Sequence, residues 1–197
     1  MKAKTYIKIK SLSIAFLLSS LTVAGQIPID TLTGKFVYEG VVVLSGQNKE
    51  TIFKKAKSWI VTTLKSGDNM VALGGNNSDE ITGTGNILIE NISTTIPKFY
   101  YTMIEGNLNF KFSIFCKDGK YKYRVENFTY TYKNYGWPEQ HTGFLEKFHN
   151  PFFNLETEKG KKANDESTQK LHADVNSQIP NLIASLEKFM MKKEIEW

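Results

Sequence analysis

The pattern of hydrophobic and polar positions along the chain predicts a strand, an amphipathic helix and then further strands. Residues 34–44, GKFVYEGVVVL, are rich in β-branched and aromatic side chains, which is typical of a strand. Within 49–64 the apolar side chains recur at helical spacing, and Asn48 is a predicted N-cap. Two more strands are predicted at 69–73 and 80–90, separated by a stretch of turn-forming residues.

A β-hairpin is the clearest element of the pattern. Its arms are predicted at 98–116 and 120–132, because Asp118 and Gly119 between them form a favoured two-residue turn. Pairing across this turn places three pairs on one face: Cys116 with Tyr121, Ile114 with Tyr123, and Phe112 with Val125. The opposite face is mostly polar, so the face that carries the tyrosines is predicted to be buried.

The apolar residues of the second arm change from odd to even positions after Val125. One extra residue at Glu126 and Asn127, a β-bulge, would restore the register. The pairs expected beyond the bulge are Phe128 with Phe110 and Tyr130 with Leu108.

The C-terminal segment 170–196 supplies a helix that can cover the tyrosine face. Its apolar side chains fall near one side of a helix: Leu171, Val175, Ile179, Leu182, Ile183, Leu186, Phe189 and Met190. Pro180 removes one backbone hydrogen bond, so a kink or a break into two helices is expected. The polar run 156–170 is predicted to be a solvated linker. The predicted fold class is α+β, a curved antiparallel sheet with one helix after the first strand and a long C-terminal helix packed on the sheet.

Residues 1–25 have the order of a secretory signal peptide: basic residues, an apolar stretch, and small residues before Gln26. The apolar stretch is shorter than the roughly 20 residues that a membrane-spanning helix needs. Cleavage is predicted after Gly25, with Ala24 as the alternative, and a lipid anchor would require a cysteine at position 26. We therefore expect a protein exported to the periplasm or secreted, with no transmembrane segment after the leader.

Charge and cysteine content narrow the function classes. Four of the 25 Lys and Arg and none of the 20 Asp and Glu lie in the leader, so the rest of the chain carries 21 basic and 20 acidic side chains. Nucleic-acid binding requires clustered basic charge, so no nucleic-acid partner is expected. Residues 26–197 have the size of one domain, with 133–170 as a long connection. Cys116 has no partner for an intramolecular disulfide.

Four stretches carry a resemblance: GKFVYEGVVVLSGQNKETIFKKAKSWI at 34–60, ITGTGN at 81–86, DGKYKYRVENFTY at 118–130 and LIASLEKFM at 182–190. In this order they look like an exported bacterial family described as a domain of unknown function with a TBP-like fold. The resemblance covers residues 34–132 and 175–191. It implies a curved sheet with helices and an envelope or secreted location, and it supplies no activity and no site residues. Segment 133–160 departs from the family pattern.

Motifs for catalysis are sparse. GTG at 83–85 lacks the rest of a phosphate-binding loop and is predicted to mark a bulge or a close backbone approach. His141, Glu146 and His149 have spacing that would suit a metal, but such residues in a surface loop are more often solvated or loop-pinning groups. The sequence carries no recognised nucleophile or zinc signature. We therefore assign no catalytic residue, no metal site and no cofactor, and we favour a function without catalysis.

Segment 135–153 concentrates aromatic side chains in a long connection: Trp137, Phe144, Phe148, Phe152 and Phe153. One interpretation is an exposed patch that binds a protein, a glycan or a membrane surface. The other, which we favour, is a turn of helix that caps an open end of the core and is stopped by Pro151. These aromatic residues are nevertheless the best candidate binding site in the sequence.

Two function classes stay open. The favoured one is a non-catalytic binding or assembly module of the bacterial cell envelope, which holds a protein or a glycan at a sheet edge or at segment 135–153. The alternative is a small-ligand carrier, or a hydrolase-type enzyme, with a cavity between the C-terminal helix and the sheet. The predicted lining of that cavity is Phe110, Phe112, Tyr123, Phe128 and Tyr130. An apolar cavity of roughly 300 Å³ or more would favour the alternative, and a filled interface would favour the first class.

Overall fold

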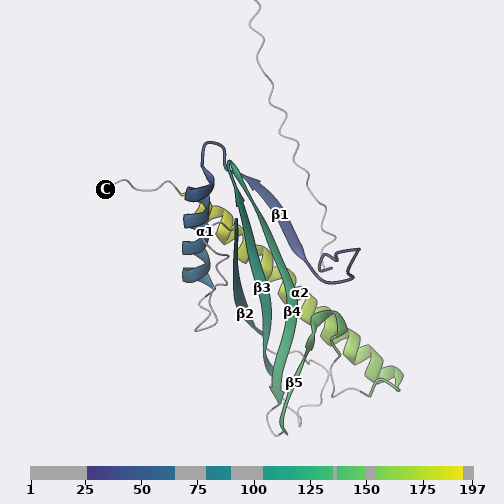
Figure 1. Ribbon diagram of the computed structural model, residues 1–197. Helices are drawn as coiled ribbons and strands as arrows, with labels where there is room; N and C mark the ends of the chain where they lie inside the picture. The colour runs from purple at the N-terminus through teal and green to yellow at the C-terminus, as the bar shows by residue number, and fades with distance from the viewer. Residues whose placement is uncertain (1–25, 65–78, 90–103, 135–136, 150–153, 193–197) are drawn as a thin grey trace, which may run out of the picture.

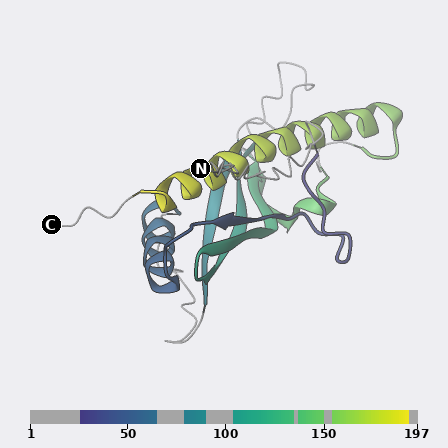
Figure 2. The same cartoon turned by 90° about the horizontal axis from the view of Figure 1, so that it is seen from above.

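The computed structural model describes five parts of the 197-residue chain: 26–64, 79–89, 104–134, 137–149 and 154–192. These parts form one antiparallel sheet with two helices packed on one of its faces (Figure 1, Figure 2). We call the face that carries the helices the inner face and the opposite one the outer face. The arrangement confirms the predicted α+β class with a long C-terminal helix.

The sheet has five strands: β1 (Tyr38–Val43), β2 (Glu80–Ile89), β3 (Ile104–Lys117), β4 (Lys120–Asn134) and β5 (Trp137–Phe144). The order is β1-β4-β3-β2, and β1 and β5 pair with different halves of the same side of β4. Sequence analysis did not predict β5, because its residues, WPEQHTGF, show no apolar alternation. The strand predicted at 69–73 lies outside the described residues.

The hairpin of β3 and β4 has the predicted turn and register. Lys117 pairs with Lys120 across the turn, and Gly119 has a φ of 72°, which glycine adopts without a steric cost. All three predicted pairs occur: Cys116 with Tyr121, Ile114 with Tyr123, and Phe112 with Val125.

The predicted β-bulge is present in β4. The strand advances from Glu126 to Thr129 while β3 advances only from Lys111 to Asn109, so β4 carries one extra residue. Asn127 has a φ of 57°, a left-handed conformation that asparagine tolerates better than most residues. Beyond the bulge the predicted partners meet: Tyr130 pairs with Leu108, and the ring centroids of Phe110 and Phe128 lie 6.1 Å apart.

Helix α1 (Lys49–Thr63) begins and packs as predicted. The Asn48 side chain accepts a hydrogen bond from the Thr51 amide at 2.9 Å and caps the first turn. Its buried side is formed by Ile52, Ala56, Trp59 and Ile60. The Trp59 and Phe112 ring centroids lie 5.0 Å apart, which fixes the helix on the inner face.

Two glycines of β2 allow α1 to approach the sheet closely. A Cβ at Gly83 would lie 2.8 Å from the Ile60 side chain, and a Cβ at Gly85 would overlap the Phe110 ring. The GTG stretch therefore marks a close approach within a strand, as predicted, and opens no helix.

Helix α2 (Glu158–Met190) is longer than predicted. The polar run 156–170, which was expected to be a linker, supplies its first turns, and Thr157 caps them by accepting a hydrogen bond from the backbone three residues on at 3.0 Å. The expectation was wrong because the buried positions of these turns hold small residues that give no apolar signal: Gly160, Ala163 and Ser167.

The α2 helix continues through Pro180, so the predicted break into two helices does not occur. Ile179 and Ile183, on either side of the proline in sequence, are both buried in the same core. This packing compensates for the backbone hydrogen bond that proline cannot donate.

The tyrosine-rich arm of the hairpin mainly faces the interior, as predicted. Tyr121 is fully buried, Tyr130 is nearly so, and Tyr123 is half-buried at the boundary. Burial raises the pKa of all three hydroxyls. These rings are therefore part of the packed interior rather than an exposed aromatic stripe.

Candidate partner-binding groove and strand edge

A groove runs between α2 and the β1 side of the sheet. Its volume is about 970 Å³, and it is open to solvent rather than enclosed. One wall is α2, and the other is formed by β1, β4 and the N-terminal segment 26–32. We call this feature the β1 groove.

The α2 wall of the β1 groove is a stripe at helical spacing: Asn176, Pro180, Ile183, Ala184 and Glu187. The Oδ1 atom of Asn176 accepts a hydrogen bond from the Tyr38 hydroxyl at 2.6 Å. Its Nδ2 atom is buried and has no partner among the described residues. Buried polar atoms are normally paired, so the Nδ2 group of Asn176 can donate a hydrogen bond to a molecule bound in the groove.

Tyr123 forms part of the opposite wall, where it crosses over Gly40. The two residues pair across β4 and β1, and a Cβ at Gly40 would lie 2.5 Å from the Tyr123 hydroxyl oxygen. The glycine therefore lets the tyrosine ring extend over β1. Burial raises the pKa of Tyr123, and the nearby carboxylate of Glu187 on α2 raises it further. A phenol from the sheet and a carboxylate from the helix thus lie close together in the groove.

Arg124 holds the N-terminal wall of the groove to the sheet. Its guanidinium forms ion pairs with Glu126 at 2.8 Å, Glu39 at 3.0 Å and Asp30 at 3.3 Å. The hydrogen bond with Glu126 is the main cause that raises the pKa of Arg124. A hydrogen bond from Lys122 is the main cause that lowers the pKa of Glu39. These charges are used to hold strands and a loop together.

The edge of β1 that points away from β4 has backbone groups that pair with no described residue, at Glu39, Val41 and Val43. The Leu44 amide donates to the Gly119 carbonyl at 2.7 Å and continues the β1–β4 register. Alternate residues of an antiparallel strand direct their N–H and C=O groups to the same neighbour. The even-numbered residues of β1 therefore bond to β4, and no described residue bonds to the outward groups of the other three.

One end of this free edge is closed and the rest is accessible. The Val37 amide donates to the Pro28 carbonyl at 2.9 Å, so the N-terminal segment covers the strand there. Further along, Val41 is 60% exposed and Val43 is 67% exposed, with both side chains on the outer face. The free edge of β1 thus begins at the groove and continues past two exposed valines.

The described members of the predicted aromatic site lie in different environments. Phe144 is 51% exposed, whereas Phe148 is buried with its ring centroid 5.1 Å from that of Tyr130. Between them the 3₁₀ turn η1 (Leu145–Lys147) buries Leu145, which agrees with the interpretation of a cap on the core. Three further calls on side chains lie outside the described residues: Trp137, Phe152 and Phe153.

The residues predicted to line a cavity are divided between the core and two grooves. Phe112 and Phe128 are fully buried, and Tyr130 is nearly so. Tyr123 lines the β1 groove, and Phe110 lines a second groove of about 400 Å³ on the β2 side of α2. The interface between α2 and the sheet is therefore filled in its centre and hollowed at both sides.

The histidines and glutamate with metal-like spacing serve other contacts or lie at the surface. Glu146 accepts a hydrogen bond from the Phe36 amide at 2.8 Å, and His149 is exposed. The side chain of His141 lies outside the described residues. Within the part of the chain that the structure describes, no three Asp, Glu, His or Cys side chains form a group that could hold a metal ion.

His172 lies between the core and the surface on α2. Its ring meets the Phe36 ring edge to face, with 5.2 Å between centroids. Its Nε2 atom is buried and has no partner among the described residues, and burial lowers the pKa of the imidazole. Burial therefore disfavours the protonated form of the His172 side chain, which packs against Phe36.

Comparison with known proteins identifies the fold. The model of a family described as a domain of unknown function (DUF4468) with TBP-like fold matches residues 38–131. Residues 38–131 therefore have the sequence pattern of the DUF4468 family. This confirms the resemblance seen in the sequence, and a search among curated proteins finds no match.

Two solved structures share the TBP-like architecture. A DUF4468 family protein from Bacteroides ovatus is 17% identical, with a TM-score of 0.56 over 87% of this chain and 94% of that chain. A TBP-like protein from Parabacteroides distasonis is 16% identical, with a TM-score of 0.56 over 85% of this chain and 99% of that chain. At these identities the likeness shows the fold alone.

The sequence named a sheet edge as a binding surface but did not locate it. The groove residues Asn176 and Glu187 were missed because each is an ordinary polar position on an amphipathic helix. The edge residues Val41 and Val43 left a weak signal, since an apolar run in a strand places every second side chain on the outer face. Among the described residues, no helix combines the length and apolarity needed to cross a membrane.

Proposed function

We propose that this DUF4468 protein is an exported, non-catalytic binding module of the cell envelope, which captures a partner protein at the free edge of β1. One observation carries this proposal: the outward backbone groups of Glu39, Val41 and Val43, beside the β1 groove, pair with no described residue. An unpaired edge strand is a template for an extended chain, which gains main-chain hydrogen bonds on pairing. The predicted leader at 1–25 supports export.

A partner protein suits this surface better than a glycan does. The edge offers alternating N–H and C=O groups at the spacing of a strand, which another polypeptide matches and a sugar does not. The charged side chains around it, Arg124, Glu39 and Asp30, are engaged with one another rather than directed at a reacting group. The arrangement favours binding over catalysis.

The proposal is tested by cross-linking in the envelope of the protein's own cells. The wild type is expected to give a cross-linked species with a partner protein, and Val41→Lys is expected to lose it, because a charge on an edge strand opposes pairing. Val61→Lys is the matched control, since Val61 is also exposed but lies on α1. Equal cross-linking of wild type and Val41→Lys would refute the proposal.

A small-ligand carrier is the second candidate, and the volume of the β1 groove favours it. Tyr123 and the unpartnered Nδ2 of Asn176 would supply the polar contacts of such a ligand. Native mass spectrometry of the protein purified from the envelope distinguishes the two candidates. A bound small mass that is lost on denaturation would establish the carrier, whereas a bare protein mass is expected for the partner-binding module.

A further inference from the structure

We infer that the partner segment is an extended strand that places a basic side chain in the β1 groove, towards Glu187, and apolar and acidic side chains over the outer face. This inference rests on the proposed function and adds the chemistry of the partner. It follows from the alternation of a strand, whose successive side chains point to opposite faces of the sheet. A segment paired with β1 must therefore satisfy two different surfaces at once.

The length of the free edge sets the length of the paired segment. Beyond Val37, whose amide is occupied by Pro28, the strand is free from Glu39 to Val43. Five residues span about 17 Å at about 3.4 Å per residue. The partner therefore pairs over about five residues, with main-chain bonds at every second one.

On the inner side, Glu187 contributes a carboxylate to the lining of the groove. The lining carboxylates of Asp30 and Glu39 are already in ion pairs with Arg124, and Glu39 also with Lys122. Within the described residues Glu187 forms no ion pair, and its negative charge contributes to the raised pKa of Tyr121 and Tyr123. A Lys or Arg of the partner would complete this site.

The α2 wall also suits the stem of a long basic side chain. Pro180, Ile183 and Ala184 present apolar surface between Asn176 and Glu187. The methylene groups of Lys and Arg pack on such surface while the charged end reaches a polar group. The residue opposite Gly40 is the one that enters here, because it faces the inner side of the sheet, next to the Tyr123 ring that covers Gly40.

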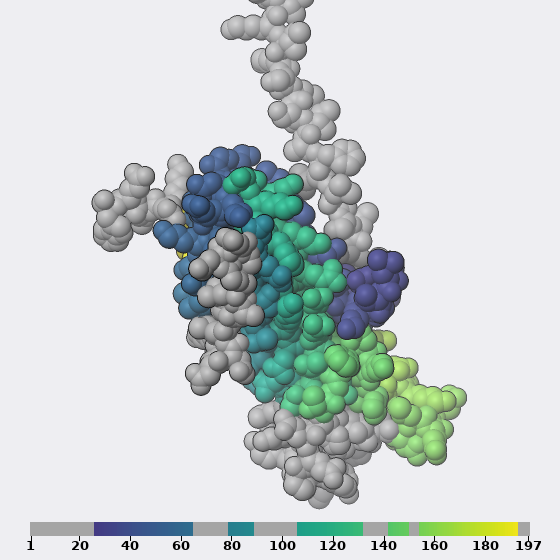
Figure 3. Space-filling view, viewed as in Figure 1, coloured from purple at the N-terminus to yellow at the C-terminus, as the bar shows by residue number. Residues whose placement is uncertain are grey.

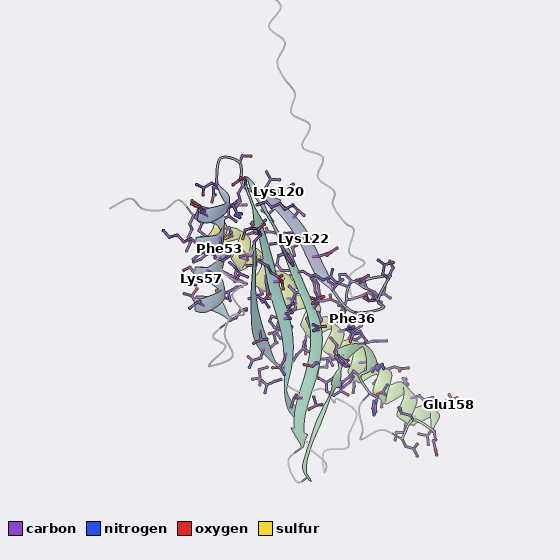
Figure 4. The ribbon with its side chains drawn as sticks, in the orientation of Figure 1. Phe36, Phe53, Lys57, Lys120, Lys122 and Glu158 are labelled. Carbon is purple, nitrogen blue, oxygen red and sulfur yellow. The ribbon has the colours of Figure 1, made fainter. Side chains whose placement is uncertain are left out.

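On the outer side, the neighbouring surface is apolar and basic. Val41 pairs with Lys122 and Val43 pairs with Lys120 across β1 and β4. Figure 4 shows both lysines on the part of β4 next to the hairpin turn, and Figure 3 shows the outer face of β3 and β4 at the molecular surface. Lys122 binds Glu39 at 2.9 Å, whereas Lys120 forms no ion pair among the described residues. A partner residue opposite Val41 is therefore apolar, and the one opposite Val43 is acidic.

The inference is tested by selecting random peptides displayed on phage against the immobilised full-length protein. The expected peptides carry a basic residue opposite Gly40, an apolar residue opposite Val41 and an acidic residue opposite Val43. The basic and acidic residues are therefore three positions apart, and the apolar and acidic residues lie on the same face of the peptide strand. Selection against Glu187→Gln should lose the basic residue and keep the alternation. Selected peptides that show no basic preference on the wild type would refute the inference while leaving edge binding intact.

The best selected peptide then serves as a probe of backbone pairing. N-methylation at the residue opposite Val41 should weaken binding about tenfold, because that N–H points at β1, whereas N-methylation at the next residue should change it little. Glu187→Gln should weaken binding of the unmodified peptide about tenfold through loss of a charge-assisted contact. Equal effects of the two N-methyl groups would show that the peptide does not pair with β1 and would overturn the proposed function as well.

A test of self-association decides whether the segment that pairs with the β1 edge comes from a second copy of this chain. If the wild type forms a dimer in sedimentation experiments and Val41→Lys abolishes it, a second copy of the chain occupies the edge and the inference is overturned. A monomer that binds the selected peptide supports the inference. Melting temperatures of Val41→Lys and Glu187→Gln close to that of the wild type ensure that lost binding does not reflect unfolding.

Discussion

The inner face of β4 and the outer edge of β1 are neighbours in the sheet and differ in almost every respect. On β4 the aromatic side chains Tyr121, Phe128 and Tyr130 are buried against the helices. On β1 the side chains of Val41 and Val43 are exposed, and their outward backbone groups pair with nothing in the part of the chain that the structure describes. The aromatic stretch that dominates the sequence is committed to packing, whereas the plainer strand presents the free hydrogen-bonding groups.

This difference shows why aromatic content is a poor guide to a binding surface in this molecule. Large rings bury much apolar area and stabilise a core. An edge strand instead binds through main-chain groups that are the same for every residue type. The side chains of β1 along this edge need only be small and accessible, as those of Val41 and Val43 are.

The largest expected effect on the free energy of unfolding comes from a substitution on the inner face. Phe112→Ala should lower the free energy of unfolding by about 3–5 kcal/mol, because it removes a fully buried ring and leaves a cavity beside Trp59. Chemical denaturation measures the loss. Phe115→Ala is the matched control on the other face of the same strand, where the ring is only half-buried, and it should cost clearly less. Similar losses at both positions would contradict the division into a packed and a solvated face.

The second-largest effect on stability is expected at the bulge, which keeps the aromatic residues of β4 on the inner face. Asn127→Val should destabilise the protein by about 1–2 kcal/mol, because a β-branched residue is strained at the φ of 57° found there. Asn127→Gly relieves the strain and serves as the control, with a change near zero in thermal unfolding. If valine were tolerated as well as glycine, the register of β4 would not depend on the bulge conformation.

The partly buried imidazole of His172, which packs on Phe36, predicts that the free energy of unfolding depends on pH. Burial lowers the pKa of its imidazole below the ordinary value of 6.5, so the unfolded chain binds a proton more readily than the folded one. The stabilising contribution is complete above pH 6.5 and is lost as the pH falls towards the lowered pKa. Denaturation between pH 7 and 5.5 should show a smaller loss for His172→Gln than for the wild type. Identical pH profiles would show that the imidazole is not desolvated.

The smallest expected effect is at the edge of β1. Val41→Thr and Val43→Thr should change the free energy of unfolding by no more than about 0.5 kcal/mol, because both side chains are largely exposed. Val125→Thr on β4 is the control, and it should cost about 1–3 kcal/mol because the hydroxyl would be buried without a partner. A large loss of stability for Val41→Thr would show that the side chain packs in the core, and the contrast between a buried β4 face and an accessible β1 edge would not hold.

Much of the fold follows from local patterns that the sequence carries. The Asp118-Gly119 turn fixes the hairpin, and the change of parity after Val125 locates the bulge, because the side-chain period of a strand is two residues. The α1 stripe and its Asn48 cap are equally local. The start of α2 was missed because small residues such as Ala163 bury without an apolar pattern.

The sequence by itself determined which faces are buried, since periodicity in a strand or helix separates an apolar side from a polar one. Only the tertiary structure decided which backbone groups remain unpaired, because strand order is set by contacts between distant segments. It placed β1 at the edge, brought Glu187 of α2 beside Tyr123 of β4, and tied segment 26–32 across one end through Arg124. A binding surface made of an edge and a groove exists only once these separate segments meet.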